Sequence, residues 1–267
     1  RKFFSALLDK IGLKQAEAGT AVTPDEAVAI ADRIGYPVLV RPSFVLGGRG
    51  MKIVYSQEEL AQYMTLAISV SNEAPVLIDK FLDQAIELDV DAICDGTDVY
   101  IGSVMQHIEE AGIHSGDSAC VLPSMTVTDE QRDEIRSATE KIARGVDVRG
   151  LINIQFAIKD EVVYIIEANP RASRTVPFIA KAYKEPYVNY ATKVMLGAKK
   201  VKDFKFNPQL EGYAIKQPVF SFEKFPNVNK NLGPEMKSTG ESILFIDSLK
   251  DDAFYDLYAR RKMYLSK

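Results

Sequence analysis

The sequence predicts an α+β fold in which a mostly antiparallel sheet carries helices. The first observation is a segment of strict alternation from Ile86 to Cys94, where polar and apolar residues occupy opposite faces of one long strand. The second is a pair of strand-like segments, 151–158 and 162–168, separated by a short polar turn typical of a hairpin. Helical and strand segments do not alternate one for one, which argues against a regular βαβ fold.

Composition limits the classes of partner. The chain has 267 residues, of which 46% are hydrophobic and 26% charged, as in an average globular protein. Its 33 Lys and Arg against 37 Asp and Glu leave a net charge of −4, which disfavours nucleic acid and anionic membranes as partners. No apolar segment approaches the roughly 18 residues that a membrane helix needs. The length suits one large domain or two smaller lobes.

Cys94 and Cys120 each stand alone, with no second Cys or His at metal-binding spacing. We interpret both as reduced, buried thiols of a cytoplasmic protein rather than as a disulfide. The chain begins at Arg1 without an initiator Met or a signal-peptide core, which suggests a piece of a longer polypeptide.

In the first part of the chain, helix and strand signals alternate. Thr23, with Pro24 at the first helical position and Glu26 three residues after the cap, opens one helix, and a second capping box lies at Ser56. The expected elements are a helix at 24–34, strands at 36–42 and 50–55 joined by the glycine-rich loop Leu46–Gly50, and a helix from 56 to about 69.

From residue 75 onward longer strands predominate. In the alternating strand, Glu87, Asp89 and Asp91 share one face, opposite an apolar face. The remaining expected elements are strands at 76–81 and 98–106, a helix at about 128–146 capped by Thr128 and Gln131, and the closing hairpin.

The closing hairpin carries oxygen-bearing side chains on its polar face. Asn153 and Gln155 share a face of the first strand, and Glu167 and Asn169 share a face of the second. A three-residue loop, Lys159–Glu161, would pair Asn153 with Glu167 and bring Gln155, Glu167 and Asn169 together. A two-residue loop would separate them unless a bulge intervened. Such ligands suit Mg²⁺ or Mn²⁺. The alternative, a solvated sheet face, would normally carry Thr, Lys and Glu.

Arg171 and Arg174 follow the second strand directly. Two guanidiniums three residues apart, beside a metal-type carboxylate, are suited to hold a phosphoryl group or a carboxylate during transfer. The alternative is a surface ion-pair network.

Two further segments are candidate binding loops. The loop at 46–50 is neither a dinucleotide-binding motif nor a P-loop, but its backbone N–H groups can approach phosphates, with Arg41 ending the preceding strand. A plain turn is the alternative. The segment Gly112–Ser118 is rich in small and polar residues, as binding loops are. Its His114 alone is more often structural than catalytic, and the sequence ties no triad partner to it.

Several blocks together resemble the large subunit of carbamoyl-phosphate synthase over essentially the whole chain. The element Glu167–Arg171 alone indicates only the wider ATP-grasp superfamily, whereas His114–Cys120 and Arg171–Phe178 are more specific. Ala168 stands where Val is more usual, on the strand face away from the ligands. The other matching blocks are Val40–Ser43, Leu46–Arg49 and Asn153–Phe156, with Leu77–Leu82, Ile108–Ser115 and Leu232–Glu241 most similar to the C-terminal of the two modules in that subunit.

The resemblance implies an ATP-grasp fold with a nucleotide between two lobes. It implies a small lobe at 1–75, a large lobe at 76–245, and a tail at 246–267 that leads towards a further domain. The residues that it implies for the nucleotide are Arg41, Gly47, Gly48, Lys80, Leu82, Glu87, Gly112, Ile113, His114, Ser115, Gln155 and Glu167. Those for metal are Gln155, Glu167 and Asn169, and those for the acceptor and transferred phosphate are Arg171, Arg174 and Asn153.

The resemblance also implies an activity and partners. A C-terminal module would use ATP, two Mg²⁺ or Mn²⁺ ions and K⁺ to phosphorylate carbamate, and an N-terminal module would phosphorylate bicarbonate. The parent enzyme would include the rest of the large subunit and a glutaminase subunit, in pyrimidine and arginine biosynthesis. Another ATP-grasp ligase, resembling biotin carboxylase or a phosphoribosyl-amine ligase, is an alternative that the block at 114–119 disfavours. A nucleotide-binding fragment that is inactive without its missing domains is another.

Overall fold

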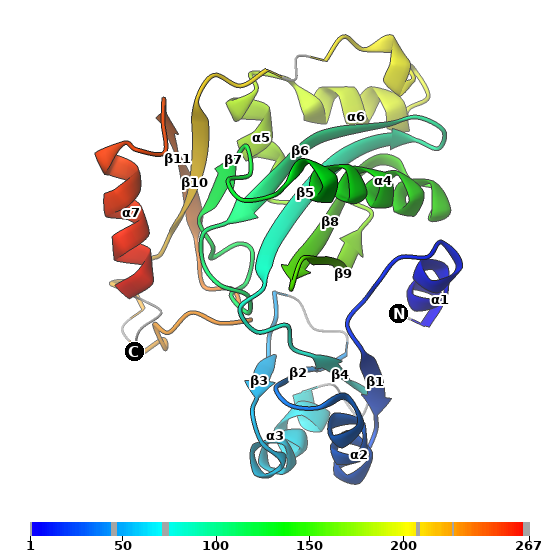
Figure 1. The fold of residues 1–267 in the computed structure, drawn as a ribbon, viewed down its shortest axis with the longest axis vertical. Coiled ribbons are helices and arrows are strands. Elements are labelled where there is room, and N and C mark those ends of the chain that lie inside the picture. The colour runs from blue at the N-terminus through cyan, green and yellow to red at the C-terminus, as the bar shows by residue number, and fades with distance from the viewer. Residues whose placement is uncertain (1, 44–46, 71–74, 207–208, 226, 264–267) are drawn as a thin grey trace.

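Two antiparallel sheets organise the chain. The computed structural model describes residues 2–43, 47–70, 75–206, 209–225 and 227–263. A four-stranded sheet has the order β1-β4-β2-β3, and a seven-stranded sheet has the order β11-β10-β7-β6-β5-β8-β9. Figure 1 shows the smaller sheet with its two helices as a separate lobe below the larger one. The predicted α+β class is confirmed.

The small lobe packs two helices against one face of its sheet. Ala27, Ala31, Leu60 and Met64 of these helices join Val38 and other strand residues in one buried cluster. The elements are β1 (Ala18–Ala21), α2 (Pro24–Ile34), β2 (Val38–Arg41), β3 (Lys52–Val54), α3 (Gln57–Val70) and β4 (Val76–Lys80).

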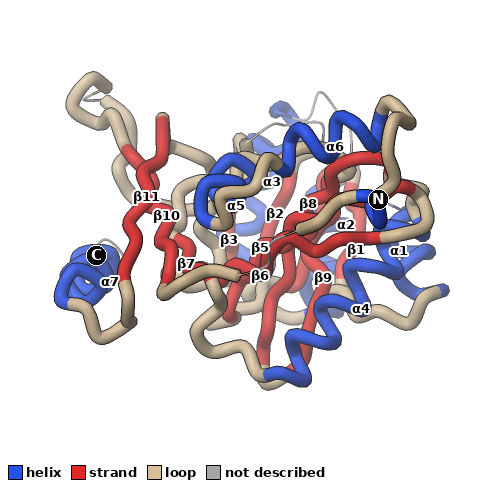
Figure 2. Tube along the Cα trace, turned by 90° about the horizontal axis from the view of Figure 1, so that it is seen from above, coloured by secondary structure: helices blue, strands red, loops and turns tan. Residues whose placement is uncertain are grey.

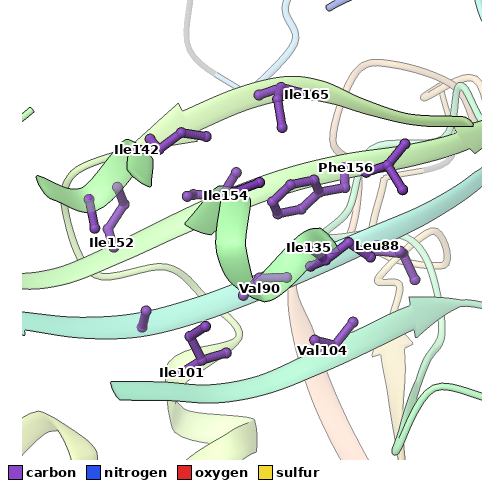
Figure 3. Close-up of a cluster of buried hydrophobic side chains, with 14 of the residues drawn as sticks. Leu88, Val90, Ile101, Val104, Ile135, Ile142, Ile152, Ile154, Phe156 and Ile165 are labelled. Carbon is purple, nitrogen blue, oxygen red and sulfur yellow. The ribbon is translucent and has the colours of Figure 1, made fainter. Parts of the chain in front are cut away.

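The seven-stranded sheet of the large lobe lies between two layers of helices. Helices α1 and α4 pack on one face, where Ile135 and Ile142 of α4 belong to the same buried cluster as Val90 and Phe156 of the sheet (Figure 3). Helices α5 and α6 cover the other face, and Figure 2 shows α4 and α6 on opposite sides of β5. The elements are α1 (Lys2–Lys10), β5 (Ile86–Asp95), β6 (Val99–His107), β7 (Cys120–Leu122), α4 (Asp129–Gly145), β8 (Arg149–Lys159), β9 (Val162–Asn169), α5 (Val176–Ala182), α6 (Tyr187–Met195), η1 (Val201–Asp203), β10 (Tyr213–Val219), β11 (Gly240–Ile246) and α7 (Asp252–Met263).

The two predicted helix starts that depend on threonine caps are confirmed. The Thr23 hydroxyl accepts a hydrogen bond from the backbone N–H of Glu26 at 3.2 Å, and α2 ends before Gly35, whose φ is 77°. Thr128 and Gln131 form a complete capping box at the start of α4.

The turn of the closing hairpin has two residues, not the three of the loop considered from the sequence, and the strand register changes with it. Lys159 pairs with Val162, so the turn has two residues, Asp160 and Glu161, and both have positive φ, at 49° and 64°. A bulge beyond Gln155 then shifts the ladder. Gln155 pairs with Glu167 and Asn153 with Asn169, so the expected Asn153–Glu167 pairing was wrong. The bulge restores the shared face that a two-residue loop alone would have lost.

Strand β5 has the predicted alternation, but its polar face is covered. Leu88, Val90 and Ala92 belong to the core beneath α4. On the opposite face Asp89 and Asp91 are only 1% and 4% exposed, so both carboxylates must find partners inside the protein.

The sheet pairing and the core packing do not divide the chain at residue 75, the boundary expected between the two lobes. Strand β4 (Val76–Lys80) pairs with β1 and β2 in the small sheet, whereas Leu8 of α1 packs in the core of the large lobe. We therefore propose a small lobe of about 18–80, with 2–10 belonging to the large lobe. In the tail, Phe254 of α7 packs against Val121 of the large sheet, while residues 264–267 lie outside the described residues.

Both cysteines are buried free thiols, as predicted. Among the described residues, no helix combines the length and the apolar character needed to cross a membrane.

Candidate active site

A cleft of ≈ 760 Å³ lies between the two lobes. Residues from both sheets and from several loops line it, which brings together segments far apart in the sequence. All of the site residues predicted from the sequence line this cleft: Arg41, Gly47, Gly48, Lys80, Leu82, Glu87, Gly112, Ile113, His114, Ser115, Asn153, Gln155, Glu167, Asn169, Arg171 and Arg174.

The small lobe contributes a cation and a glycine flap to the cleft. Arg41 at the end of β2 reaches Asp79 within its own sheet and Glu167 across the cleft, each at 3.3 Å. Gly47 and Gly48 have φ of 61° and 71°, a region that favours glycine. A Cβ built on Gly48 would overlap the carbonyl oxygen of Pro234, so the flap lies directly against the large lobe. Leu46, the first residue of the predicted loop, lies outside the described residues.

The bulged hairpin carries the three residues predicted to bind a metal, Gln155, Glu167 and Asn169. The Asn169 amide nitrogen donates to Glu167 at 3.0 Å, and the Gln155 amide nitrogen donates to the Ser115 hydroxyl at 3.0 Å. Both amide nitrogens are thus engaged within the protein, and the amide carbonyl oxygens are the groups that a cation would use, although that of Asn169 also accepts from the Arg171 guanidinium at 3.5 Å.

This donor set fits Mg²⁺. Within the described residues, no three His, Cys, Asp or Glu side chains are arranged to hold a metal, so a site here would combine one carboxylate with amide oxygens. Mg²⁺ is typically held by one or two carboxylates, with substrate phosphates and water completing the coordination. Gln155, Glu167 and Asn169 would therefore be its protein ligands.

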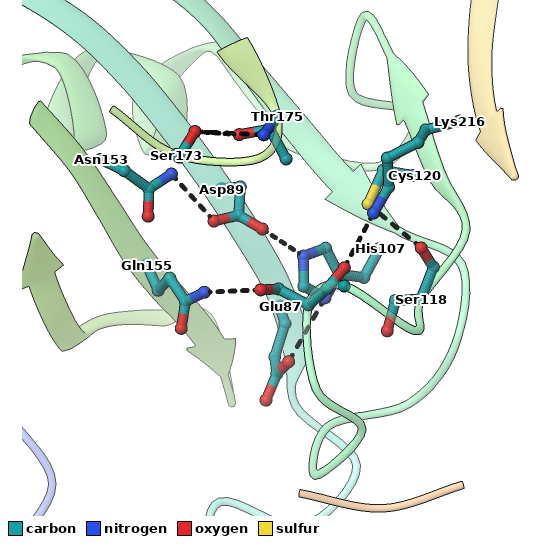
Figure 4. Close-up of polar contacts among 12 residues, drawn as sticks. Glu87, Asp89, His107, Ser118, Cys120, Asn153, Gln155, Ser173, Thr175 and Lys216 are labelled. Carbon is teal, nitrogen blue, oxygen red and sulfur yellow. Dashed lines mark hydrogen bonds and ion pairs between the residues drawn. The ribbon is translucent and has the colours of Figure 1, made fainter. Parts of the chain in front are cut away.

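A network of charged side chains extends from the cleft into the large lobe. His107 Nε2 is 2.8 Å from Asp89, and its Nδ1 is 3.3 Å from Glu87 (Figure 4). Burial disfavours the charged imidazole, but the Cys120 sulfur, Asp89 and Glu87 overcome this effect, so the pKa of His107 is raised well above its usual value. Burial would raise the pKa of Asp89, but hydrogen bonding and charge from His107 outweigh it, with smaller contributions from Asn153 and Lys216, and lower that pKa.

Asn153 is part of this network rather than an exposed cleft group. Its amide nitrogen donates to Asp89 at 3.1 Å and to Asp91 at 3.2 Å, and the residue is only 3% exposed. The predicted acceptor-site residue therefore links two buried carboxylates at the edge of the cleft.

The loop 112–118 is held from three sides. The Gly112 N–H donates to Glu87 at 3.2 Å, and buried Lys216 of β10 donates to the carbonyl oxygen of Ser115 at 2.8 Å. Asp117 accepts from the backbone N–H groups of Lys237 and Ser238, each at 2.8 Å. Burial lowers the pKa of His114 against the opposing effect of nearby carboxylates, so this imidazole is neutral at pH 7.

Arg171 and Arg174 are exposed residues of the segment 170–175 between β9 and α5, which we call the arginine loop and in which Thr175 is buried. The Arg171 guanidinium donates to the Ala172 carbonyl oxygen at 2.9 Å, while that of Arg174 lies against the Met236 sulfur. Both arginines line the same cleft as Gln155, Glu167 and Asn169, an arrangement suited to a charged group in transfer.

Sequence comparison decides the family. Residues 1–202 match the family model described as the carbamoyl-phosphate synthase L chain, ATP binding domain. The chain belongs to this family. The family assignment agrees with the blocks at 114–120 and 171–178 from which the resemblance was inferred.

Relatives of this family are similar across most of the chain. The carbamoyl phosphate synthase large chain, C-terminal section, of Methanocaldococcus jannaschii is 56% identical over 254 residues, covering 91% of this chain and 41% of the relative. The protein of the same name from Aquifex aeolicus is 49% identical over 273 residues, covering 96% and 50%. The large chain of Methanothermobacter thermautotrophicus is 51% identical, covering 100% and 26%. The chain thus spans a quarter to a half of these relatives.

Solved structures show the fold at much lower identity. The biotin carboxylase domain of a Hydrogenobacter thermophilus 2-oxoglutarate carboxylase, in complex with MgADP, ADP and bicarbonate, matches with a TM-score of 0.74 and 18% identity. The alignment covers 98% of this chain and 64% of that one. N5-carboxyaminoimidazole ribonucleotide synthetase from Thermus thermophilus matches with a TM-score of 0.70 and 16% identity, covering 100% and 71%. The family member described here therefore has the ATP-grasp fold.

Some residues of the site were not predicted as such. Asp79, Asp89 and Lys216 line the cleft, and His107 lies directly behind it. The alternation of β5 signalled Asp89 through the face that it shares with Glu87. No local pattern signalled Lys216, because β10 was not among the expected strands.

Proposed function

We propose that this chain transfers the γ-phosphoryl group of ATP to carbamate and forms carbamoyl phosphate, as one module of a longer large chain. The observation that carries the proposal is the meeting of Gln155, Glu167 and Asn169 with Arg171 and Arg174 in one cleft. The carbamate step is favoured over the bicarbonate step because the chain resembles two relatives named as C-terminal sections.

In this proposal the nucleotide lies between the lobes. Its phosphates lie beneath the flap, near Arg41, while the adenine and ribose lie near Lys80, Leu82 and Glu87 and the loop 112–115. Lys80 is held in place because its amine donates to the carbonyl oxygens of Gly35 and Tyr36, at 3.0 and 2.9 Å. Glu87 is oriented by His107 and by the Gly112 N–H.

Phosphoryl transfer depends mainly on position and on fixed charge. Bound Mg²⁺ or Mn²⁺, two ions in the proposal, would neutralise phosphate charge at Gln155, Glu167 and Asn169. Arg171 and Arg174 would hold the acceptor carboxylate and the phosphoryl group in line, with Asn153 beneath them. The closed cleft would exclude water from carbamate and from the transferring group.

The wider context belongs to the same proposal. A MgADP and bicarbonate complex of a protein with the same fold supports these ligand classes. The rest of the large subunit, a glutaminase subunit, a role for K⁺, a cytoplasmic location, and a place in pyrimidine and arginine biosynthesis are proposed from the resemblance of this chain to the family.

The test runs the reaction in reverse. With MgADP and carbamoyl phosphate, we expect the chain to form ATP, and we expect Arg174→Ala to lower the rate by about 100-fold. In the forward direction, the rate at which bicarbonate stimulates ADP release from ATP should be far lower than the rate of ATP synthesis from carbamoyl phosphate.

The same assay distinguishes the alternatives. Bicarbonate-stimulated ADP release without ATP synthesis would favour the bicarbonate-phosphorylating module. Nucleotide binding with neither reaction would favour a fragment that is inactive without its missing domains. Either result would contradict the proposal.

A further inference from the structure

The arginine loop is fixed to the sheet at the two residues that flank Arg174. The Ser173 hydroxyl donates to Asp91 Oδ1 at 2.6 Å, and the Thr175 hydroxyl donates to Asp91 Oδ2. The two hydroxyl oxygens are themselves 2.7 Å apart, and the Thr175 N–H donates to the Ser173 hydroxyl at 3.2 Å. One carboxylate therefore determines where the backbone on both sides of Arg174 lies.

Asp91 is itself anchored in the centre of the large sheet. It belongs to β5, between β6 and β8, and pairs across the ladder with Asn153, whose amide nitrogen bonds both Asp91 and Asp89. Figure 4 shows Asn153, Ser173 and Thr175 around Asp89, close to the buried His107. The anchor of the arginine loop is thus continuous with the polar network behind the cleft.

A carboxylate at this position is costly to the fold. Asp91 is 4% exposed and lies near Asp89. Its burial, together with the nearby charge of Asp89, raises the pKa of Asp91 to about 6, although hydrogen bonds from Ser173 and Thr175 oppose this rise. If the role of this site were only structural, apolar side chains in place of Asp91 and its hydroxyl partners would fill it with a smaller desolvation cost. The arrangement is better explained by the position that it imposes on Arg174.

We propose that Asp91 is a positioning residue for phosphoryl transfer, which holds Arg174 over the reacting group by fixing Ser173 and Thr175. This inference rests on the proposed function. Asp91 acts on the transfer step rather than on nucleotide binding, because the adenine side of the cleft is formed by other elements, near Lys80 and Glu87. A misplacement of about 1 Å in such a group can cost on the order of 100-fold in rate.

The kinetic test measures kcat and KM for MgADP in ATP synthesis from carbamoyl phosphate. Asp91→Asn and Thr175→Val should lower kcat by about 10- to 100-fold and change KM for MgADP by less than about threefold. Thr175→Ser keeps the hydroxyl and should recover most of the kcat lost in Thr175→Val. Asp160→Asn is the matched control. It makes the same change from a carboxylate to an amide, but at an exposed residue in the turn between β8 and β9.

A double variant separates positioning from a general folding defect. If Asp91 acts through Arg174, adding Asp91→Asn to Arg174→Ala should lower kcat no further, because the group that it positions is gone. A further drop in the double variant would overturn the proposal, as would an unchanged kcat in Asp91→Asn or a failure of Thr175→Ser to recover activity.

A measurement without turnover keeps this inference separate from the proposed function. Amide hydrogen exchange in 171–176 should be faster in Asp91→Asn and Thr175→Val than in the parent chain, and near the parent rate in Thr175→Ser. Unchanged exchange in Asp91→Asn overturns the anchoring even if the chain makes no ATP. Faster exchange in a chain that makes no ATP supports the anchoring and counts against the proposed function instead.

Discussion

Asp91 gives the buried network a pH dependence of its own. Its pKa in the fold, about 6, lies above that of an Asp in an unfolded chain, about 4, so the folded state binds the proton more tightly. Lowering the pH from 7 to 5 therefore protonates the folded carboxyl first. For this group alone, the free energy of unfolding should rise by about 1 kcal/mol over that range.

Urea unfolding at pH 7 and pH 5 checks this prediction. The free energy of unfolding of the parent chain minus that of Asp91→Asn should be larger at pH 5 by about 1 kcal/mol. Asp89 and His107 are present in both proteins, so their own contributions largely cancel in the difference. A difference that stays constant or falls with decreasing pH would contradict the raised pKa.

At the residue scale, the cleft-lining groups could be predicted because their chemistry is local. Glu167, Asn169 and Arg171 lie within one short segment, and their oxygen and guanidinium groups indicate metal and phosphate chemistry directly. The roles of Asp91 and His107 could not be predicted, because alternation places a residue on a face without saying whether other elements cover that face. The two carboxylates of β5 are buried only because β6, β8 and the arginine loop pack around them, and these elements also supply their hydrogen-bond partners.

At the element scale, a large-lobe segment holds the glycine flap. The N–H of Met236 donates to the carbonyl oxygen of Gly47 at 2.9 Å, and Asp117 fixes the same segment through two backbone N–H groups. The flap and the loop 112–118 are thus connected through residues 233–238. Backbone contacts of this kind hold the glycine loop of the small lobe over the cleft. The close approach requires glycine at position 48, because a Cβ there would overlap the Pro234 carbonyl oxygen.

Gly48→Ala should separate the flap from this segment. The new Cβ would overlap the Pro234 carbonyl oxygen at a residue with φ of 71°, at a cost of about 1–2 kcal/mol. We expect the Kd for MgADP to rise by about 5- to 30-fold, measured by calorimetric titration. The matched control is Gly233→Ala, since a Cβ there meets nothing within 4 Å. Equal affinities in the two variants would count against a role for the flap in nucleotide binding.

The hairpin shows where prediction at the element scale stops. Alternation predicted both strands of the hairpin and the faces of Gln155 and Glu167. It could not choose the loop length, because Asp160 and Glu161 adopt positive φ, which is uncommon for residues other than glycine. The bulge beyond Gln155 depends on pairing along the whole ladder, and so it is visible only in the folded hairpin.

At the scale of the whole molecule, the site exists only where the lobes meet. Arg41 of the small sheet contacts Glu167 of the large sheet at 3.3 Å, and the flap contacts the segment 233–238. The sequence predicted two lobes but not which elements belong to each, since β4 joins the small sheet by pairing with β1 and β2. Long-range pairing of this kind leaves little trace in local composition.

The central claim is that the cleft binds a nucleotide through Mg²⁺ held at Glu167, and the most direct test is calorimetric titration with ADP. The comparison uses Mg²⁺ against EDTA, for the parent chain, Glu167→Gln and the control Glu161→Gln, an exposed acid in the turn of the same hairpin. We expect Mg²⁺ to tighten ADP binding in the parent chain and in Glu161→Gln, and to have little effect in Glu167→Gln. Undiminished tightening by Mg²⁺ in Glu167→Gln would contradict the claim.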